Sequence, residues 1–260
     1  MKVDAHRTWP AHLWLVRHGQ SAGNVARDRA EAAGHGEIEV AERDADVPLS
    51  VLGERQSRAI GRWFGRLPPT QRPDVILTSP YLRARQTADI VAREAGLPAD
   101  VDLFADERLR EKEFGLLDRL TRAGVLERFP EQATLRARVG KFYHRPPGGE
   151  SWCDVILRVR SVIDEIQLQH AARRLLVVAH QVIVLSFRYV LERMTEQEVL
   201  AVDASGDVAN CAVTTYEAAQ RPGGGQDASQ MVLSCYNHLA PMEEDGAPVT
   251  STPDAAVAPR

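Results

Sequence analysis

Short runs of largely apolar residues recur along the chain, and each stops abruptly at a polar loop. Residues 13–16, 75–78 and 175–179 are such runs, and they lead into Arg17-His18-Gly19, Ser79-Pro80 and His180-Gln181. Apolar runs of this length with polar boundaries are typical of buried strands. The pattern therefore predicts three buried strands that each end in a polar loop.

Segments between these runs carry helix-start signals followed by apolar residues at helical spacing. The signals stand at Ser50, at Ser79-Pro80 and at Ser151 with Asp154. Ser is a favoured N-cap, Pro is favoured at the first helical position, and Ser with an acidic residue three positions on is typical of a capping box. We expect helices after each signal, the second one running to about Ala95, and a further apolar helix over residues 182–193.

The remaining segments complete an alternating pattern. Residues 101–117 have an extended pattern, residues 118–144 one or two helices, and residues 212–216 and 231–236 two strands that can pair as a hairpin. The connection between those last strands contains Gly223-Gly224-Gly225. Strands that alternate with helices predict an α/β layered fold with a mostly parallel sheet.

Two segments lack a clear pattern. Residues 26–47 are rich in Ala, Glu, Asp and Gly without periodicity, so we interpret them as a mobile, partly helical excursion with the character of a lid. From residue 240 the content of Pro, Ala, Ser and Thr predicts a disordered tail. We therefore expect one domain over residues 1–239 and a tail over residues 240–260.

Composition narrows the class of protein. The chain has 260 residues, 44% of them apolar, and a net charge of −4, which disfavours a nucleic-acid-coating protein. Cys153, Cys211 and Cys235 are widely spaced and suggest neither disulfides nor a zinc site. With no signal-peptide pattern and no apolar run long enough to span a membrane, we expect a cytoplasmic protein, monomeric or homodimeric, without a membrane partner.

The polar loops after the predicted strands carry the candidate chemistry. In parallel sheets, ligands gather beyond the carboxyl ends of the strands. If these ends are neighbours, one cationic, donor-rich set converges there: Arg17, His18, Ser21, Asn24, Arg83 and His180. Phosphoryl oxygens require fixed positive donors, and the planar guanidinium fork suits them. The set predicts a phosphate pocket.

A histidine in such a pocket can act as a nucleophile. A neutral imidazole attacks phosphorus when a backbone carbonyl holds its second nitrogen, while Asn24 and Gln181 can add neutral donors to the phosphoryl oxygens. The arginines then supply the charge stabilisation that a metal gives elsewhere, so we expect neither a metal nor a cofactor.

The leaving oxygen needs a proton donor, and the stretch from Arg110 to Gly115 offers two carboxylates. In extended backbone Glu111 and Glu113 share a face, so either can be the acid. Beside a dianionic phosphate a carboxyl group retains its proton because like charges repel. The alternative interpretation of this stretch is a solvated charged turn.

Two rival functions deserve comparison. Gly19-Gln20-Ser21-Ala22-Gly23 fits the G-x-S-x-G elbow of serine hydrolases, yet fewer than twenty residues precede it, too few for the strand and loop that complete an oxyanion hole. A non-catalytic phosphate-binding module needs neither a nucleophile nor a proton donor. Both fit the residues less well than a phosphoryl-transfer enzyme.

The residues resemble the histidine phosphatase superfamily, also called phosphoglycerate mutase-like, over roughly residues 13–216. The motifs that match are Leu15-Val16-Arg17-His18-Gly19-Gln20-Ser21 with Asn24; Pro48-Leu49-Ser50 with Leu52-Gly53 and Gln56; Thr78-Ser79-Pro80 with Arg83-Ala84 and Gln86-Thr87; Leu109, Glu111 and Gly115; Pro147-Gly148-Gly149-Glu150-Ser151; Val178 with His180; and Asn210-Cys211-Ala212-Val213. The resemblance implies a three-layer α/β/α sandwich with a six-stranded, mainly parallel sheet.

The resemblance also implies roles. His18 is the phosphorylated nucleophile, Arg17, Arg83 and His180 complete the phosphate pocket, and Glu111 rather than Glu113 is the proton donor. We further expect Gln20, Ser21, Asn24 and Gln181 to bind substrate, and the substrate to be a small phosphorylated metabolite.

The chain departs from the family in two places. Gln181 stands where many relatives have glycine, and its side chain can narrow the pocket or contact substrate. The signature that follows the first motif in glycolytic mutases is replaced by residues 25–46. We therefore expect a phosphomonoester hydrolase, with a mutase-type phosphoryl transferase as the alternative.

One group of basic residues bears on the substrate. The group consists of Arg122, Arg128, Arg136, Arg138, Lys141 and Arg145. These cations either favour a second acidic group on the substrate or form a solvated helix face.

Overall fold

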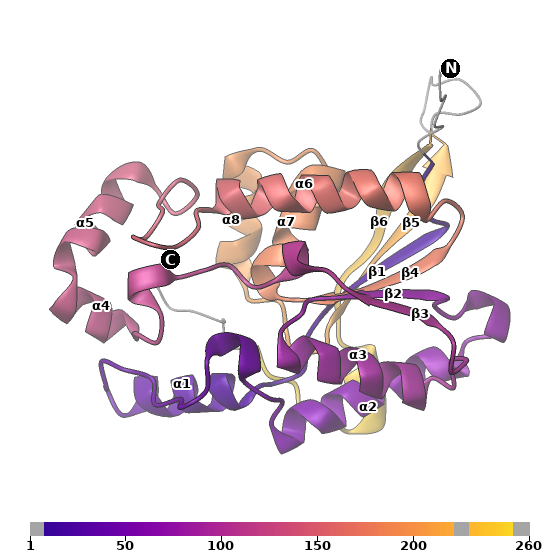
Figure 1. Ribbon diagram of the computed structural model, residues 1–260, viewed down its shortest axis with the longest axis horizontal. Coiled ribbons are helices and arrows are strands. Elements are labelled where there is room, and N and C mark those ends of the chain that lie inside the picture. Colours follow the sequence, from indigo (N-terminus) through magenta and orange to yellow (C-terminus); the bar gives the residue numbers. More distant parts are fainter. Residues whose placement is uncertain (1–7, 221–228, 252–260) are drawn as a thin grey trace.

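The computed structural model describes residues 8–220 and 229–251 and shows a central sheet covered by helices on both faces (Figure 1). The glycine run at 223–225 and residues 252–260 lie outside the described residues. This arrangement confirms the predicted α/β/α layering.

The sheet has six strands in the order β3-β2-β4-β1-β5-β6. Strands β1, β2, β3 and β4 run parallel, whereas β5 is antiparallel to both of its neighbours, so the predicted hairpin of the last two strands is confirmed. Their bounds are β1 His12–Arg17, β2 Val75–Thr78, β3 Asp102–Ala105, β4 Arg174–Ala179, β5 Val213–Gln220 and β6 Ser229–His238.

Side-chain alternation along the central strands builds two separate cores. In β1, Leu13 and Leu15 face the core shared with α6 (Trp152–Gln169), α7 (Gln181–Leu191) and α8 (Glu196–Ser205). Trp14 and Val16 face the core shared with α2 (Val51–Arg66), α3 (Leu82–Glu94) and α9 (Ala240–Asp245). Because strand side chains alternate with period two, a strand buried on both faces has a continuous apolar sequence.

Three helices lie beyond the carboxyl ends of the parallel strands. They are α1 (Ala22–Ala32), α4 (Arg122–Arg128) and α5 (Pro130–Val139), of which α4 and α5 stand apart from the sheet at one end of the molecule (Figure 1). The segment after α1 contains a 3-10 turn, Asp44–Asp46. The predicted helices in residues 118–144 are confirmed, and the excursion predicted at residues 26–47 begins inside a regular helix.

The extended interpretation of residues 101–117 is wrong beyond the short strand β3. Two 3-10 turns, Glu107–Leu109 and Gly115–Leu117, follow β3. Gly115 adopts a φ of +53°, and a Cβ atom there would lie 2.2 Å from the carbonyl oxygen of Pro147, so this turn requires glycine.

The expected disorder from residue 240 onward is contradicted as far as residue 251. Helix α9 packs on α2 through Met242, which is fully buried, and the amide of Asn210 donates to the carbonyl oxygen of Thr250 at 2.8 Å. Composition misled here because a few well-placed apolar and polar residues anchor an otherwise small-residue segment. Among the described residues, no helix has the length and apolar character needed to cross a membrane.

Candidate active site

The register of the parallel strands brings the two predicted histidines together. Arg17 of β1 pairs with Ala179 of β4, and the amide of His18 donates to the carbonyl oxygen of Ala179 at 2.9 Å. His180 follows directly, so the two imidazole rings lie with their centroids 5.0 Å apart at an interplanar angle of 65°. Both side chains are fully buried.

Hydrogen bonds define the tautomer of His18. Its Nδ1 lies 2.7 Å from the carbonyl oxygen of Gly19, which can only accept, so Nδ1 carries the proton. The Nε–H of Arg83 donates to His18 Nε2 at 3.3 Å, so Nε2 has a lone pair. The ring is therefore a neutral imidazole with Nε2 as its nucleophilic atom.

Arg83 reaches His18 from the first turn of α3 and is itself held by the 3-10 turn after α1. Its Nη1 donates to the backbone oxygen of Asp44 at 2.6 Å, and the two terminal nitrogens lie 3.0 and 3.2 Å from the Asp44 carboxylate oxygens. Asp44 thus holds the end of the guanidinium while its Nε faces His18. No signal in residues 26–47 identified this contact.

Arg17 lies fully buried at the end of β1. Its Nη1 donates to the carbonyl oxygen of Val208 at 2.6 Å and to Gln181 Oε1 at 3.3 Å, and Gln181 Nε2 donates to Asp207 at 3.0 Å. Gln181, expected to contact substrate or narrow the pocket, is thus bound to the arginine expected to bind phosphate.

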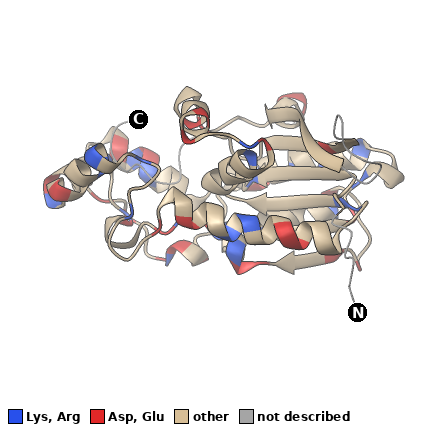
Figure 2. Ribbon diagram, turned by 90° about the horizontal axis from the view of Figure 1, so that it is seen from above, with Lys and Arg blue, Asp and Glu red and all other residues tan. Residues whose placement is uncertain are grey.

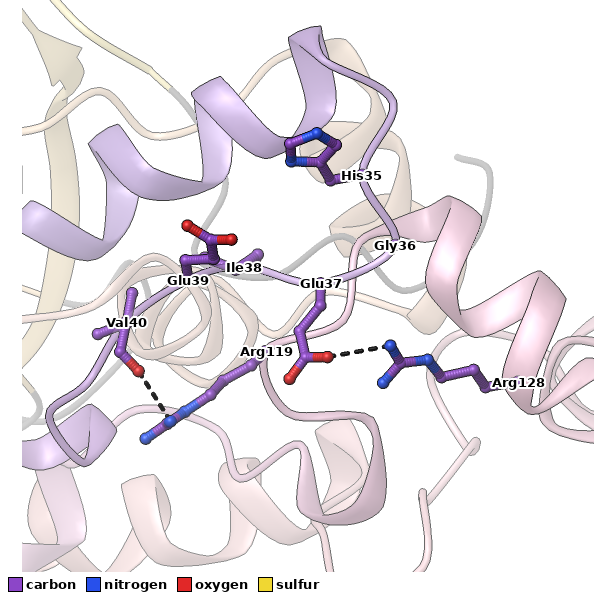
Figure 3. A pocket seen from close by; sticks show the side chains of 8 residues that line it. All are labelled: His35, Gly36, Glu37, Ile38, Glu39, Val40, Arg119 and Arg128. Carbon is purple, nitrogen blue, oxygen red and sulfur yellow. Dashed lines mark hydrogen bonds and ion pairs between the residues drawn. The ribbon is translucent and has the colours of Figure 1, made fainter.

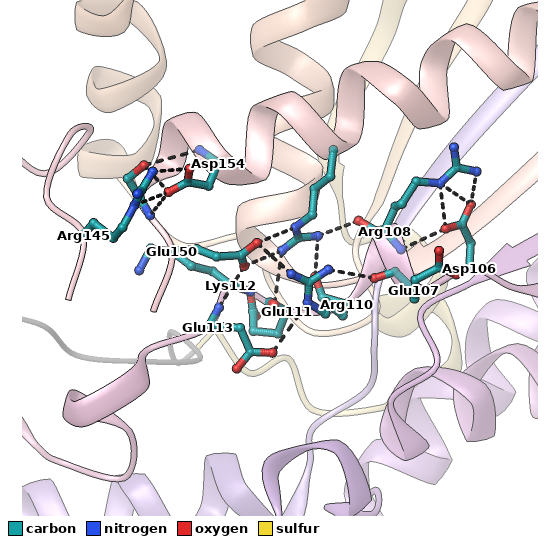
Figure 4. A network of polar contacts seen from close by, with 12 residues as sticks. Asp106, Glu107, Arg108, Arg110, Glu111, Lys112, Glu113, Arg145, Glu150 and Asp154 are labelled. Atoms are coloured by element: carbon teal, nitrogen blue, oxygen red, sulfur yellow. Dashed lines mark hydrogen bonds and ion pairs between the residues drawn. The ribbon is translucent and has the colours of Figure 1, made fainter. Parts of the chain in front are cut away.

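Glu111 and Glu113 occupy different environments, contrary to the expectation of a shared face. Glu111 is 1% exposed; its Oε1 accepts from the amide of Lys112 at 2.7 Å, and its Oε2 lies 3.7 Å from His180 Nδ1. The Glu113 side chain is 46% exposed and accepts from the Tyr81 hydroxyl at 3.0 Å. Both residues lie between the two 3-10 turns that follow β3 (Figure 4), and of the two only Glu111 is placed beside a pocket histidine.

Ser79 was predicted to cap a helix, but its side chain contacts a histidine of the site. Helix α3 begins at Leu82 with Tyr81 as its N-cap, not at Ser79-Pro80. The Ser79 hydroxyl lies 2.8 Å from His180 Nε2 and accepts from the Tyr81 amide at 3.2 Å. It therefore orients the second histidine, because the β2 end lies next to the β4 end.

Hydrogen bonds of its own side chains shape the loop after His18. Ser21 caps α1 in a capping box with Asn24: the Asn24 amide donates to Ser21 Oγ at 3.1 Å, and the Ser21 amide donates to Asn24 Oδ1 at 2.9 Å. The Gln20 side-chain oxygen accepts from the Ser50 hydroxyl at 2.8 Å. Ser21, Asn24 and Gln20, expected to bind substrate, therefore all shape this loop.

The capping role also weakens the serine hydrolase alternative. Within the described part of the chain, the Ser21 hydroxyl bonds with Asn24 and with no histidine. A serine nucleophile requires a base within hydrogen-bond reach.

Two glycines allow the loop to pack against α2. A Cβ atom on Gly19 would lie 2.5 Å from the carbonyl oxygen of Gly53, and one on Gly53 would lie 2.0 Å from that of Gln20. Side-chain atoms do not fit at such distances, which explains both glycines in the motifs.

The C-terminal segment is linked by hydrogen bonds to the loop that contains His18. Asn210 Nδ2 donates to the carbonyl oxygen of His18 at 3.0 Å, and Asn210 Oδ1 accepts from the Thr250 hydroxyl at 2.9 Å. Gln56 Nε2 donates to that hydroxyl at 3.0 Å, and Gln56 Oε1 accepts from the Gln20 amide at 2.9 Å. A chain of hydrogen bonds thus links residue 250 to the His18 loop.

Two hollows share lining residues, and the smaller one reaches Arg83, which contacts His18. The smaller, of about 50 Å³, is lined among others by Asn24, Arg27, Arg83 and Arg119. The larger, of about 510 Å³, shares Ile38 and Arg119 with it and is lined by residues 35–40, Arg119 and Arg128 (Figure 3). Within residues 8–220 and 229–251, no group of three or more His, Cys, Asp or Glu side chains is arranged to hold a metal ion.

The chain is similar in sequence to a phosphoglycerate mutase and to a phosphoglycerate mutase-like protein. The chain is 32% identical over 189 residues to the 2,3-bisphosphoglycerate-dependent phosphoglycerate mutase of Methylobacterium radiotolerans, covering 72% of this chain and 82% of that protein. It is 29% identical over 172 residues to phosphoglycerate mutase-like protein AT74H of Arabidopsis thaliana, covering 63% of this chain and 56% of that protein.

A solved structure shares the fold. The native mycobacterial glucosyl-3-phosphoglycerate phosphatase superposes with a TM-score of 0.65 at 25% identity, covering 88% of this chain and 99% of that one. The family model described as the histidine phosphatase superfamily, branch 1, matches residues 13–223. The chain therefore belongs to the histidine phosphatase superfamily, as its motifs and its pair of facing histidines indicated.

Proposed function

We propose that this protein hydrolyses phosphomonoesters of small polar metabolites through a phosphohistidine on His18. The observation that carries the proposal is the protonation pattern of His18: Nδ1–H is held by the Gly19 carbonyl oxygen, and the Nε2 lone pair faces Arg83. A nucleophilic nitrogen beside a fixed guanidinium is what attack on a phosphoryl group requires.

In the first step, His18 Nε2 forms a bond to phosphorus while the bond from phosphorus to the ester oxygen breaks. The Arg83 and Arg17 guanidiniums balance the charge on the equatorial oxygens. The protonated carboxyl of Glu111 gives its proton to the leaving oxygen, which departs as an alcohol. Glu111 suits this task because it is buried and adjoins His180.

In the second step, water replaces the alcohol. The Glu111 carboxylate takes a proton from water as its oxygen bonds to phosphorus, and the bond from phosphorus to Nε2 breaks, returning the electron pair to the imidazole. Inorganic phosphate leaves and Glu111 is protonated again. The cycle uses only groups that this chain supplies.

The adjoining hollows suit a polar leaving group. The larger has a volume within the range of small-molecule sites, and charged side chains such as Glu37, Arg119 and Arg128 line it (Figure 3). Arg119 and Arg128 are already engaged, with Val40 and Glu42 carbonyl oxygens and with Glu37. A hydroxyl-rich alcohol can exchange hydrogen bonds with such a wall.

The test is a panel of phosphorylated metabolites assayed for phosphate release by the wild type and by His18→Ala. We expect turnover of polar phosphomonoesters by the wild type and a loss of at least about a thousandfold in the variant, because the covalent route is removed. Equal turnover by both proteins contradicts the proposal. Tight binding of esters without turnover by the wild type would instead favour a binding module.

A phosphoglycerate mutase is the second candidate, and the similarity to phosphoglycerate mutases favours it. It differs in the acceptor: the phosphohistidine returns its phosphoryl group to an organic hydroxyl rather than to water. Incubation with 3-phosphoglycerate and a trace of 2,3-bisphosphoglycerate separates the two activities. Release of inorganic phosphate without 2-phosphoglycerate supports the hydrolase, and accumulation of 2-phosphoglycerate supports the mutase.

A further inference from the structure

The segment that carries the proposed acid is irregular, so its shape depends on contacts with other parts of the chain. Glu111 lies between the 3-10 turns Glu107–Leu109 and Gly115–Leu117, outside any helix or strand. The backbone groups of such a segment need side chains or water as hydrogen-bond partners. A general acid also needs a fixed position, because a small displacement from the leaving oxygen costs much of the rate.

Arg158 of α6 holds this segment with its whole guanidinium, and its side chain is 10% exposed. Its Nη1 donates to the carbonyl oxygens of Arg108 and, at 2.8 Å, of Arg110, and its Nη2 donates to that of Glu111 at 3.2 Å. Nε and Nη2 also donate to the two carboxylate oxygens of Glu150, at 2.9 and 3.0 Å. An arginine has five N–H donors, so each of them is used here.

Glu150 extends the contact to the other side of the acid. Its Oε2 accepts from the amide of Glu113 at 3.0 Å, and its own amide donates to the carbonyl oxygen of Glu113 at 2.9 Å. Burial alone would raise the pKa of Glu150, but the hydrogen bonds and the charge of Arg158 hold that pKa below its ordinary value. Figure 4 shows Glu150 within the network that includes Glu111 and Glu113. The Arg158–Glu150 pair therefore fixes the backbone on both sides of Glu111.

The start of α6 sets the position of this pair. Glu150 stands directly before Ser151, the N-cap of the helix, and Arg158 follows about two turns later. Helical side chains lean toward the N-terminus, so the arginine stem can run back along α6 to Glu150. Charged residues of both signs lie along this helix (Figure 2). Arg160, two positions on, is exposed, with its guanidinium 6.0 Å from the centroid of the Tyr189 ring.

The contacts of Arg158 lead directly to the carboxyl group of the acid. The carbonyl oxygen of Glu111 is bound to Arg158, and the next amide, that of Lys112, donates to Glu111 Oε1 at 2.7 Å. Glu111 Oε2 lies 3.7 Å from His180 Nδ1. Removing the guanidinium leaves three carbonyl oxygens around the acid without this partner, so the segment loosens and the carboxyl group loses its fixed position.

We infer that Arg158, together with Glu150, is a positioning residue that holds Glu111 where it can protonate the leaving oxygen. The inference rests on the proposed function, because it requires Glu111 to be the acid of the first step. Arg158 acts through Glu111 and is not itself a catalytic residue. The inference also explains Glu150 in the motif at residues 147–151, which the proposed reaction does not use.

The test compares two esters that differ in their need for the acid. An alkyl alcohol must gain a proton as it leaves, whereas 4-nitrophenolate is a stable anion and leaves without one. We therefore measure kcat/KM for propyl phosphate and for 4-nitrophenyl phosphate, because kcat/KM reports on the steps up to release of the alcohol. Glu111→Gln is the reference and should lose about a hundredfold or more with propyl phosphate and much less with the aryl ester.

Arg158→Met should lower kcat/KM by at least about tenfold with propyl phosphate and by less than about threefold with 4-nitrophenyl phosphate. Arg158→Lys keeps a cation beside Glu150 and should show the same selectivity with a smaller loss, because an ammonium cannot reproduce the arginine fork. Arg160→Met is the matched control on the same helix and should stay within about twofold for both esters. An equal loss with both esters in the Arg158 variants, or no loss with either, overturns the inference.

Hydrogen exchange gives a readout that does not need turnover. Peptides that cover residues 108–113 should exchange about tenfold or more faster in Arg158→Met and at the wild-type rate in Arg160→Met, because the amides of Lys112 and Glu113 lose fixed acceptors. Unchanged exchange in Arg158→Met overturns the inference. A wild-type protein that hydrolyses neither ester refutes the proposed function instead, and exchange then still decides whether Arg158 holds the segment.

Discussion

Replacing Thr250 with valine tests whether the C-terminal segment holds the nucleophile loop. Valine keeps the shape of the side chain and removes only the hydroxyl, which donates to Asn210 Oδ1 and accepts from Gln56 Nε2. The backbone hydrogen bond from the Asn210 amide to the Thr250 carbonyl oxygen stays in place. The substitution therefore isolates the link between residue 250 and the His18 loop.

The magnitude follows from the two lost hydrogen bonds. Each contributes about 0.5–1.5 kcal/mol, so the free energy of unfolding should fall by about 1–3 kcal/mol. In a chain of this size, that corresponds to a Tm lower by about 2–10 °C. Because Asn210 also donates to the carbonyl oxygen of His18, we expect kcat/KM to fall as well, through looser positioning of the imidazole.

Urea unfolding followed by circular dichroism measures the stability, and phosphate release measures kcat/KM. Ser251→Ala is the matched control, because it removes a hydroxyl from the next residue, which is exposed and makes no hydrogen bond within the described chain. The reasoning is refuted if the two variants unfold at the same urea concentration as the wild type and retain its kcat/KM.

Three further predictions concern a charge, a positioning residue and a close packing contact. Lys112→Met should be more stable than the wild type by up to about 3 kcal/mol below pH 8, because burial lowers the pKa of Lys112 to about 8; this advantage should shrink as pH rises from 8 toward 10.5, since folding of the wild type releases a proton from Lys112 in that window and is therefore favoured by rising pH, and urea unfolding across pH checks it. Asp44→Asn should lower kcat/KM about tenfold by weakening the hold on Arg83, whereas Asp46→Asn in the same turn, which only releases Arg43, should leave it within about twofold. Gly53→Ala should destabilise the protein by about 1–3 kcal/mol or prevent folding, whereas Gly65→Ala on the same helix, with its nearest contact at 3.3 Å, should be tolerated, as thermal denaturation of both variants will show.

Local rules were enough to predict most of the central fold. The strands at residues 13–16, 75–78 and 175–179 were recognisable because burial on both faces removes polar residues from them. Ser50 and Ser151 were recognisable as helix N-caps because serine is a preferred N-cap residue and each stands just before apolar residues at helical spacing. These patterns depend only on residues a few positions apart, so the folded protein keeps the local structure that they predict.

Contacts distant in sequence were beyond these rules. Ser79 has the same local pattern as a cap, but the neighbouring end of β4 supplies His180 as its partner. Asp44 and Thr250 lie in segments of unremarkable composition, and their importance comes from Arg83 and Asn210, which approach only after the chain has folded. The local pattern also did not show that Gln20, Ser21 and Asn24 hold the loop after His18.

The most direct measurement is the position of the phosphoryl group on a trapped intermediate. The enzyme is mixed with a good substrate, quenched in base to preserve phosphoramidates, and studied by peptide mass spectrometry and ³¹P NMR. Because Nδ1–H of His18 is held by Gly19 and Nε2 faces Arg83, the phosphoryl group should be found on Nε2 of His18. Phosphate on Nδ1, on another residue, or on no residue during rapid turnover would contradict the account.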